Sequence, residues 1–350
     1  MAWIPPLLLH YYITERCNSN CSFCDIWRRP AGDDALPEDV EKNLRDAARL
    51  GLRFVDFTGG EPLLHPQLPR MLRSARLAGL RTTLTTNALL YPERAGELAG
   101  MVDFLHFSLD ASTALDHDRL RGRPVFEKVM TSIDLARKIG EKPDLIFTAL
   151  PGNLHHLPRL ADFCRRLGLM LIVNPLFSDP GKRELTQQNL AFIEQYTRHP
   201  FVYINRAFHL LRKRGGNSTE KPRCRVVDGV IVISPQNQLI LPCYHYEQAR
   251  IGLEKGLAAH RASPAVREHR SRQGRWPGCS GCVLNCYFDP SFTYRIDRFF
   301  MQSMAAKIKY ARDKYLHAPL LRTFTGLDQR PAADIMAGLT ALAETPAEAR

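Results

Sequence analysis

Short β-rich runs alternate with amphipathic helical stretches from residue 7 to residue 177, and this alternation is the strongest constraint on the fold. Repeats of this length form right-handed parallel strand–helix–strand units. Four of the helical stretches end directly before a glycine, which suits the left-handed cap of a helix: Pro37–Leu50, Pro66–Ala78, Val125–Ile139 and Leu157–Leu167. The expected strands are Leu7–Thr14, Phe54–Thr58, Arg81–Asn87, Phe104–Asp110, Asp144–Leu150 and Leu169–Phe177. The chain is therefore predicted to be α/β, with an open doubly wound sheet or a barrel that does not close.

The expected strands carry polar residues at regular positions. Strands of a parallel sheet that is covered on both faces are usually unbroken apolar runs. Here His106, Ser108 and Asp110 share one face of a strand, while apolar residues occupy the other. The polar faces favour a barrel with a ligand-filled interior, for which the candidate lining residues are His10, Tyr12, Asp56, His106 and Asn174. The alternative for each is a core polar residue with internal hydrogen bonds.

Nine cysteines constrain the chemistry. The apolar N-terminus has no basic region and no small-residue cleavage site, so we interpret it as a buried strand and expect a cytoplasmic protein without a membrane span. Thiols in that compartment stay reduced, and clustered thiols there indicate metal. Cys164 stands alone and receives no role, while the others form two groups: Cys17, Cys21 and Cys24; and Cys224, Cys243, Cys279, Cys282 and Cys286.

The first group is the run C-N-S-N-C-S-F-C, directly after the first expected strand. An iron–sulfur cubane usually takes four ligands, and cysteine thiolates are the preferred ones. Cys17, Cys21 and Cys24 supply three, which leaves one iron open for an outside ligand. Structural zinc fits poorly, because no fourth cysteine or histidine is close by.

The segment Tyr11–Trp27 resembles the signature loop of the radical S-adenosylmethionine (SAM) superfamily. The resemblance implies a [4Fe–4S] cluster whose open iron is chelated by S-adenosylmethionine. It further implies reductive cleavage of this cofactor to a 5′-deoxyadenosyl radical that abstracts a substrate hydrogen. A flavodoxin- or ferredoxin-like reductant is then expected to supply the electron.

Further motifs resemble the cofactor-binding positions of the same family. The turn Gly59-Gly60-Glu61-Pro62 resembles the element whose backbone and glutamate receive the cofactor's ammonium group. The segments Thr85–Asn87 and Ser108–Asp110 resemble ribose-binding positions, and His117–Gly122 resembles the element whose arginine pairs with the methionine carboxylate. The resemblance therefore implies cofactor contacts from Gly59, Gly60, Glu61, Asn87, Ser108, Asp110 and Arg121. A surface salt bridge is the alternative for Arg121.

The second cysteine group resembles the C-terminal region of the SPASM and twitch subfamilies, which hold auxiliary clusters. A full two-cluster pattern has more cysteines, including one after the CxxC group, and none follows Cys286. The resemblance thus implies one auxiliary [4Fe–4S] cluster, bound by four of the five thiolates or by three with substrate at the fourth iron. A structural zinc ribbon is the alternative. Which four cysteines bind is left open.

These features predict a partial (β/α)6 TIM-like barrel with a small C-terminal cysteine-rich auxiliary-cluster domain. The expected divisions are the barrel over residues 1–180, a helical linker over 181–223, the auxiliary-cluster domain over 224–320 and a tail over 321–350. A hairpin is expected over Val226–Leu241 and helices over Phe299–Tyr315 and Ala332–Ala343. The net charge of +12 fits a solvated basic face or an acidic substrate or redox partner. Nucleic acid is not expected, because no basic motif is interleaved with aromatic residues.

The expected function is hydrogen abstraction for the oxidation or functionalisation of a small-molecule intermediate, such as a cofactor, pigment, lipid or secondary metabolite. Because the first strand begins near Leu7, no N-terminal peptide-recognition domain is expected. One alternative is maturation of a ribosomal peptide with a separate recognition partner. Another is a non-catalytic iron–sulfur electron carrier, which would not need the cofactor-binding positions. The sequence names no catalytic residue beyond the cofactor machinery.

Overall fold

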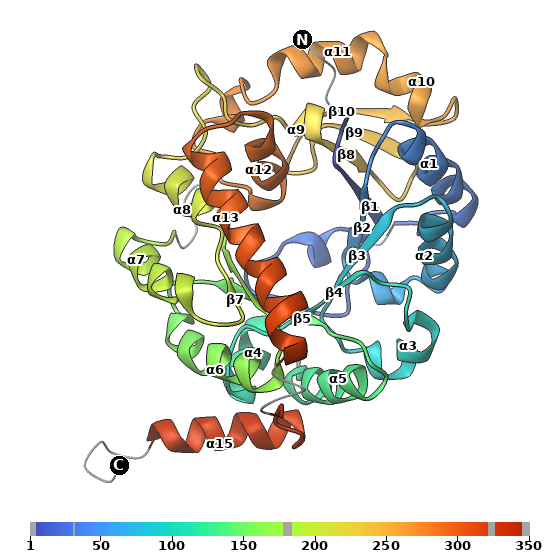
Figure 1. The fold of residues 1–350 in the computed structure, drawn as a ribbon. Helices are drawn as coiled ribbons and strands as arrows, with labels where there is room; N and C mark the ends of the chain where they lie inside the picture. Colours follow the sequence, from blue (N-terminus) through green and yellow to red (C-terminus); the bar gives the residue numbers. More distant parts are fainter. Residues whose placement is uncertain (1–4, 31, 178–183, 321–325, 345–350) are drawn as a thin grey trace.

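The computed structural model describes residues 5–30, 32–177, 184–320 and 326–344. Its single sheet has the strand order β10-β9-β8-β1-β2-β3-β4-β5-β6-β7. From β8 to β7 every strand is parallel to its neighbours, whereas β9 runs antiparallel to both β8 and β10. The edge strands β7 and β10 are not paired with each other in the described residues, so the barrel stays open (Figure 1). The predicted partial α/β barrel is confirmed.

The six predicted barrel strands are present, with ends shifted by one or two residues. They are β1 (Leu8–Thr14), β2 (Phe54–Gly59), β3 (Arg81–Thr86), β4 (Phe104–Ser108), β5 (Asp144–Ala149) and β6 (Leu171–Pro175). The helices that follow them are α1 (Pro37–Arg49), α2 (Leu68–Leu77), α3 (Tyr91–Leu98), α4 (Ala114–Arg121), α5 (Phe126–Lys138) and α6 (Leu157–Leu167).

The two faces of each barrel strand differ as the alternation of polar and apolar residues predicts. On β4, Leu105 and Phe107 are buried against the outer helices, and the Phe107 ring lies 4.6 Å from the ring of Tyr91 at the start of α3. His106 and Ser108 point to the opposite face, which lines the barrel interior. The apolar core therefore lies between the sheet and the helices, and the interior keeps its polar side chains.

The C-terminal half extends the barrel sheet. Its elements are α7 (Gln187–Gln195), β7 (Val202–Tyr203), α8 (Arg206–Lys213), α9 (Val226–Gly229), β8 (Val230–Ile233), β9 (Gln238–Cys243) and β10 (Tyr246–Gly252). The expected hairpin is formed by β8 and β9, but its first four residues form the short helix α9. Strand β8 pairs with β1, so the hairpin continues the barrel sheet. The domain divisions stay a prediction.

The remaining helices are α10 (Leu257–Arg261), α11 (Pro264–Arg272), α12 (Asn285–Ser291), α13 (Arg298–Arg312) and α15 (Ala332–Glu344). Helix α13 and the turn after it run across one end of the barrel, in front of the strands in Figure 1. There Lys314 Nζ lies 2.7 Å from Asp144 Oδ1, and Tyr310 donates to Asp144 Oδ2 at 2.5 Å. Asp144 begins β5, so these contacts close the amino end of the barrel.

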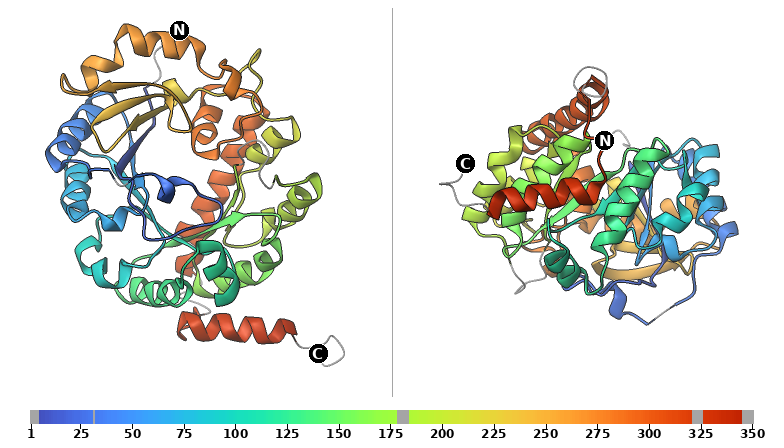
Figure 2. Two further views of the ribbon diagram at one scale, coloured as in Figure 1. Left: turned by 180° about the vertical axis from the view of Figure 1, so that it is seen from behind. Right: turned by 90° about the horizontal axis from the view of Figure 1, so that it is seen from below.

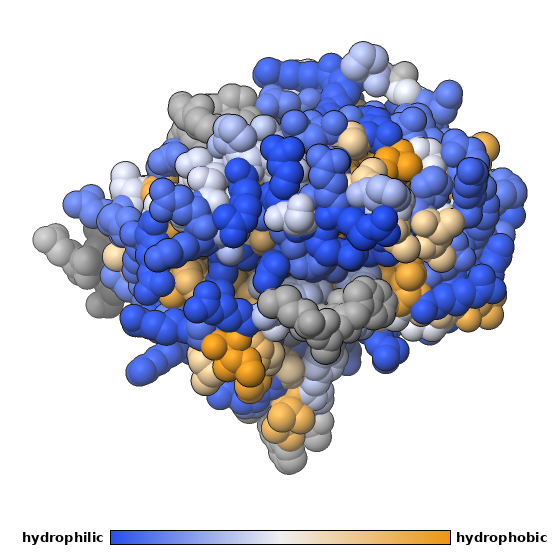
Figure 3. Space-filling view, turned by 90° about the horizontal axis from the view of Figure 1, so that it is seen from above, coloured by the Kyte–Doolittle hydropathy of each residue, from blue (hydrophilic) through white to orange (hydrophobic). Residues whose placement is uncertain are grey.

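The opposite end of the barrel carries the carboxyl ends of the strands. The loop after β1, with its short 3-10 helix η1 (Ile26–Arg28), lies across this end. It is visible in Figure 2 (left), which shows the molecule from the side opposite to Figure 1. The face over the C-terminal region is mostly hydrophilic with scattered apolar positions (Figure 3). None of the helices in the described residues has the length and apolar character to cross a bilayer.

Candidate active site

The loop after β1 carries the first cysteine group and is fastened to the end of α4. The backbone N–H groups of Asn20 and Ser22 donate to the carbonyl oxygens of Arg121 and Leu120 at 3.0 and 2.9 Å. The indole of Trp27 donates to the Cys21 carbonyl at 3.3 Å. The position of the cysteine loop therefore depends on the end of α4, and the Trp27 contact within the loop helps to fix its shape.

The three thiols of this loop lie close enough to interact electrostatically. Burial raises the pKa of Cys17 to about 11 and also raises the pKa of Cys24. The backbone N–H of Ser19 donates to the sulfur of Cys17, and that of Ile26 donates to the sulfur of Cys24. N–H groups aimed at sulfur suit thiolates bound to an iron–sulfur cluster, and a bound metal removes the thiol proton.

Gly59 and Gly60 bring the end of β2 against the start of the cysteine loop. The N–H of Gly60 donates to the Thr14 carbonyl at 2.9 Å. A Cβ on Gly59 would lie 1.9 Å from that same oxygen, and a Cβ on Gly60 would lie 2.1 Å from the carbonyl oxygen of Arg16. Both glycines are thus required by a close backbone approach between two loops.

Glu61 is buried and joins the ends of β2 and β3. One carboxylate oxygen accepts from the Leu63 N–H at 3.0 Å and from the Thr86 hydroxyl at 2.7 Å, and the other accepts from the Asn87 N–H at 2.8 Å. Burial raises the pKa of Glu61. The Asn87 amide in turn donates to Asn18 and Ser19 of the cysteine loop at 2.8 and 2.9 Å. Glu61 and Asn87 therefore link three strand ends around the thiols.

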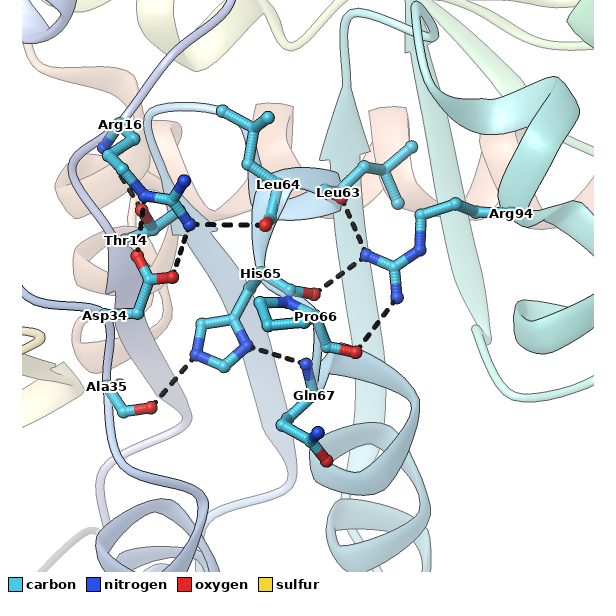
Figure 4. Close-up of polar contacts among 10 residues, drawn as sticks. All are labelled: Thr14, Arg16, Asp34, Ala35, Leu63, Leu64, His65, Pro66, Gln67 and Arg94. Atoms are coloured by element: carbon cyan, nitrogen blue, oxygen red, sulfur yellow. Dashed lines mark hydrogen bonds and ion pairs between the residues drawn. The ribbon is translucent and has the colours of Figure 1, made fainter.

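A second layer of polar contacts supports this turn from outside (Figure 4). The guanidinium of Arg94 donates to the carbonyl oxygens of Leu63 and His65 at 2.7 and 2.8 Å. Nδ1 of His65 accepts from the Gln67 N–H, so Nε2 carries the proton and donates to the Ala35 carbonyl at 3.0 Å. Arg16, at the start of the cysteine loop, pairs with Asp34. None of these supports was predicted from the sequence.

Asp110 and Arg121 form a buried ion pair beside the first thiol group. Arg121 Nη2 lies 2.5 Å from Asp110 Oδ2, and Nη1 lies 3.7 Å from the sulfur of Cys21. The Nε of Arg121 is buried and has no hydrogen-bond partner in the described residues. The predicted Arg121 is thus a buried cation beside the thiols, and its unpaired donor fits an anionic group such as a carboxylate.

The other predicted ribose position, Ser108, ends β4 and is buried. Two residues further on, the N–H of Asp110 donates to Nδ1 of His117, which lies in the predicted arginine element, at 3.1 Å. Burial and the nearby Arg121 lower the pKa of His117 well below its ordinary value, so its ring is neutral. All seven predicted cofactor-binding residues therefore gather at the carboxyl ends of the strands or in the loops and helix beyond them, where α/β barrels place their chemistry.

Four cysteines of the second group lie near one another. The thiols of Cys224, Cys243, Cys279 and Cys282 interact electrostatically in every pair. Each also accepts a backbone N–H from another residue, such as Val226 for Cys224. Burial raises the pKa of Cys243 to about 12 and that of Cys282 to about 11. The same environment surrounds the first group, so this set suits a second cluster.

Cys286, on α12, differs from these four thiols. The backbone N–H that interacts with its sulfur is its own, and its strongest electrostatic neighbours are Cys243, Cys282 and Asp56. It alone among the five lines a cavity at the carboxyl ends of β5 and β6. The four-thiol set is therefore the better match to four ligands.

The five predicted lining residues lie on the interior face of their strands. His10 Nδ1 lies 2.9 Å from Asp56 Oδ2 on the neighbouring strand, and His106 Nδ1 lies 3.2 Å from the Thr85 hydroxyl. The Tyr12 ring packs against Tyr244, next to Cys243. Asn174 lines the cavity that contains Cys286. His10, Asp56 and His106 thus have internal partners, whereas Asn174 faces open space.

Thr148 is a cavity residue that the sequence reasoning missed. It lies on β5 directly opposite Asn174 on β6, and its N–H donates to Asp110 Oδ1 at 2.8 Å. The alternation that selected Asn174 would have selected Thr148, had it been applied to β5.

Comparison with known proteins places these features in a family. Residues 11–164 match the model of the radical SAM superfamily. An "AdoMet-dependent heme synthase" of Methanosarcina barkeri is 34% identical over 170 residues, or 47% of this chain and 48% of that protein. A "probable GTP 3′,8-cyclase" of Methanococcus maripaludis is 28% identical over 165 residues, or 45% of this chain and 55% of that protein. The chain spans about half the length of these curated relatives.

Solved structures share the fold at low sequence identity. SuiB of Streptococcus suis, bound to S-adenosylmethionine, matches with a TM-score of 0.62 and 20% identity, covering 84% of this chain and 75% of that one. The enzyme anSMEcpe with bound AdoMet matches with a TM-score of 0.61 and 16% identity, covering 90% of this chain and all of that one (100%). The shared fold includes the C-terminal half, beyond the residues that the family model matches.

Proposed function

The chain belongs to the radical SAM superfamily, and from this premise we propose that Cys17, Cys21 and Cys24 hold the cluster that binds S-adenosylmethionine, in an enzyme for a small-molecule substrate. The observation that supports the ligand assignment is the convergence on one loop of three thiols, the Gly59–Glu61 turn and the Asp110–Arg121 pair. When bound, the cluster and S-adenosylmethionine supply a 5′-deoxyadenosyl radical that removes a hydrogen atom from a substrate carbon.

The residues around the loop have separate tasks in this proposal. Gly59 and Gly60 let the turn approach the cysteine loop, and Glu61 fixes the ends of β2 and β3. Arg121 receives the cofactor carboxylate: its Nε has no partner in the described residues, and its Nη1 lies 3.7 Å from the sulfur of Cys21. Ser108 offers its hydroxyl to the ribose at the end of β4, while Asn87 and Asp110 border the same position and are held by Asn18, Ser19 and Arg121. The barrel walls exclude water from the reacting centre.

The second part of the proposal concerns Cys224, Cys243, Cys279 and Cys282, which hold one auxiliary [4Fe–4S] cluster. Their electrostatic interactions in every pair and their backbone N–H donors support this set of four over any that includes Cys286. A second cluster can accept one electron and so favours a net substrate oxidation. The cavity of about 300 Å³ supports a small molecule, since it is at the small end of ligand pockets.

Anaerobic reconstitution with iron and sulfide tests the proposal. With S-adenosylmethionine and dithionite, the wild-type protein is expected to release 5′-deoxyadenosine, and Cys21→Ser is expected to release none. Cys164→Ala is the matched control, because this thiol is buried in α6 away from both groups. Absence of 5′-deoxyadenosine from the wild-type protein would refute the enzyme reaction.

Metal analysis separates the auxiliary cluster from zinc. Two [4Fe–4S] clusters give about eight iron atoms per chain, and loss of one leaves about four. Cys243→Ser and Cys282→Ser are each expected to halve the iron content and to keep release of 5′-deoxyadenosine. One zinc atom with about four iron atoms in the wild-type protein would establish the zinc-ribbon alternative.

A further inference from the structure

A cavity of about 300 Å³ lies between the carboxyl ends of β5 and β6 and helix α12. Its apolar wall includes Pro175, Phe177 and Phe208. Polar groups enter it from Thr148 and Asn174. An apolar wall with a few polar groups is the usual composition of a small-molecule site.

Thr148 and Asn174 occupy directly opposite positions on β5 and β6. Neither side chain has a hydrogen-bond partner in the described part of the chain. Asn285, also in the wall, is in contrast occupied, because it donates to the Pro175 carbonyl at 2.9 Å and accepts from Arg212 at 3.1 Å. A free hydroxyl beside a free carboxamide matches a ligand group that both donates and accepts hydrogen bonds.

The charge of the wall favours an uncharged ligand group. Asp289 is the one charged side chain among the described residues that line the cavity. Its carboxylate is already partnered, since it accepts from the Asn205 amide at 2.9 Å and lies 3.0 Å from Lys307 Nζ. An anionic ligand group in the cavity would be repelled by this carboxylate.

Residues of the cavity wall are linked to both thiol groups. On one side, Thr148 N–H donates to Asp110, whose partner Arg121 lies 3.7 Å from the sulfur of Cys21. On the other side, Cys286 lines the cavity and has Cys243 and Cys282 as neighbours. A molecule in this cavity would therefore lie close to the cofactor site and to the second thiol group.

Building on the function proposed above, we propose that this cavity receives the substrate and that Cys286 faces it as a free thiol. Thr148 and Asn174 hold an uncharged group of the substrate that donates and accepts hydrogen bonds, in its simplest form the carboxamide of a small molecule. Cys286 is a positioning contact for that molecule and is not a cluster ligand.

Two alkylating probes of similar size test the proposal on the reconstituted full-length protein, without oxygen. Iodoacetamide carries a neutral carboxamide and iodoacetate carries an anion; with either probe the sulfur displaces iodide, a C–S bond replaces the C–I bond, and the thiol proton passes to the buffer. Peptide mass spectrometry measures the labelling rate at Cys286. The ratio of the iodoacetamide rate to the iodoacetate rate is expected to exceed the ratio for glutathione by about tenfold, the net effect of one hydrogen bond.

Three variants test whether Thr148 and Asn174 cause the preference of Cys286 for iodoacetamide. Thr148→Val and Asn174→Leu keep the side-chain size and are each expected to bring the ratio close to that of glutathione. Thr83→Val makes the same change on the interior face of β3, outside the cavity, and is expected to leave the ratio unchanged. Iron content is measured throughout and is expected to stay constant while Cys286 is labelled.

The contrary outcomes are distinct. Labelling of Cys286 only in step with iron loss would show that it is a cluster ligand. A ratio equal to that of glutathione in the wild-type protein would refute carboxamide selection, and a faster reaction of iodoacetate would indicate an anion site. Propionamide is expected to slow labelling more than the blocked tripeptide Ac-Ala-Ala-Ala-NH2; the reverse order would favour a peptide substrate. Release of 5′-deoxyadenosine in the same preparation reports separately on the proposed function.

Discussion

The rings of Tyr12 and Tyr244 lie parallel, with their centroids 3.9 Å apart and their planes 11° apart. Tyr12 is a buried residue of β1, two positions before the strand ends at Thr14 and the cysteine loop begins, and Tyr244 directly follows Cys243. The Tyr244 hydroxyl donates to Glu15 at 3.0 Å, and the guanidinium of Arg29 lies 4.3 Å from the Tyr244 ring centroid. This stack connects the backbone that carries the first thiol group to the backbone that carries the second.

Removal of the Tyr244 ring is therefore expected to destabilise the fold around both thiol groups and to weaken their hold on iron. Tyr244→Leu leaves a gap beside Tyr12 and should lower the free energy of unfolding by about 3 kcal/mol, as for other large aromatic truncations. Iron loss to a chelator, followed by absorbance near the iron–sulfur bands, should become faster. Tyr244→Phe keeps the stack and loses only the hydroxyl, so its cost should be about 1 kcal/mol. Equal effects of the two variants would show that the hydroxyl, and not the stack, is the important contact.

Gly60 is expected to accept no side chain at all. In Gly60→Ala the new Cβ would lie 2.1 Å from the Arg16 carbonyl oxygen, so the cysteine loop must move away from the turn. The reconstituted variant should hold about half of the wild-type iron, because one of two clusters is disturbed. The control is Gly96→Ala on the exposed face of α3, where the new Cβ meets no atom within 4 Å and helix stability should rise by up to about 1 kcal/mol. Wild-type iron content in Gly60→Ala would contradict this prediction.

The barrel strands and the cysteine loop could be predicted from the sequence because their signals are local. Apolar alternation, helix-ending glycines and cysteine spacing each depend on a few neighbouring residues. The six strands appear where expected, and the face shared by His106 and Ser108 does line the interior.

The supports of the site could not be predicted, because they join residues that are far apart in the chain. Arg94 binds carbonyl oxygens about thirty positions earlier, and a carbonyl group leaves no sequence signal. The pairing of β8 with β1 likewise depends on a contact between residues more than 200 positions apart. The different surroundings of Cys286, which lines the cavity, also required the structure, since the spacing alone allows any four cysteines.

Arg94 is expected to keep the turn after Glu61 rigid. Arg94→Met removes donors from the carbonyl oxygens of Leu63 and His65, which leaves them without these partners. Each lost hydrogen bond should cost about 1 kcal/mol. Amide hydrogen exchange over residues 62–67 should therefore accelerate by about tenfold or more. Arg76→Met, on the exposed side of α2, is the control and should leave the exchange in this segment unchanged. Unchanged exchange in Arg94→Met would exclude this role.

His209 on α8 is expected to make the stability depend on pH between about 4 and 6.5. Burial lowers the pKa of this histidine from 6.5 to about 4, although its Nδ1 lies 3.0 Å from Glu194 Oε1. The unfolded chain therefore takes up a proton at higher pH than the folded protein does. The stabilising contribution is present above pH 6.5 and is lost as the pH falls toward 4.

Urea unfolding of the wild-type protein and of His209→Gln measures this contribution, because glutamine can still donate to Glu194 but does not titrate. From pH 7 to pH 5 the wild-type protein should lose about 2 kcal/mol more than the variant, the equivalent of about 1.5 pH units below the unfolded pKa. Comparison of two proteins with the same clusters cancels the acid sensitivity that the clusters themselves bring. If the free energy of unfolding changed equally with pH in the two proteins, His209 would accept a proton in the folded state as readily as in the unfolded chain.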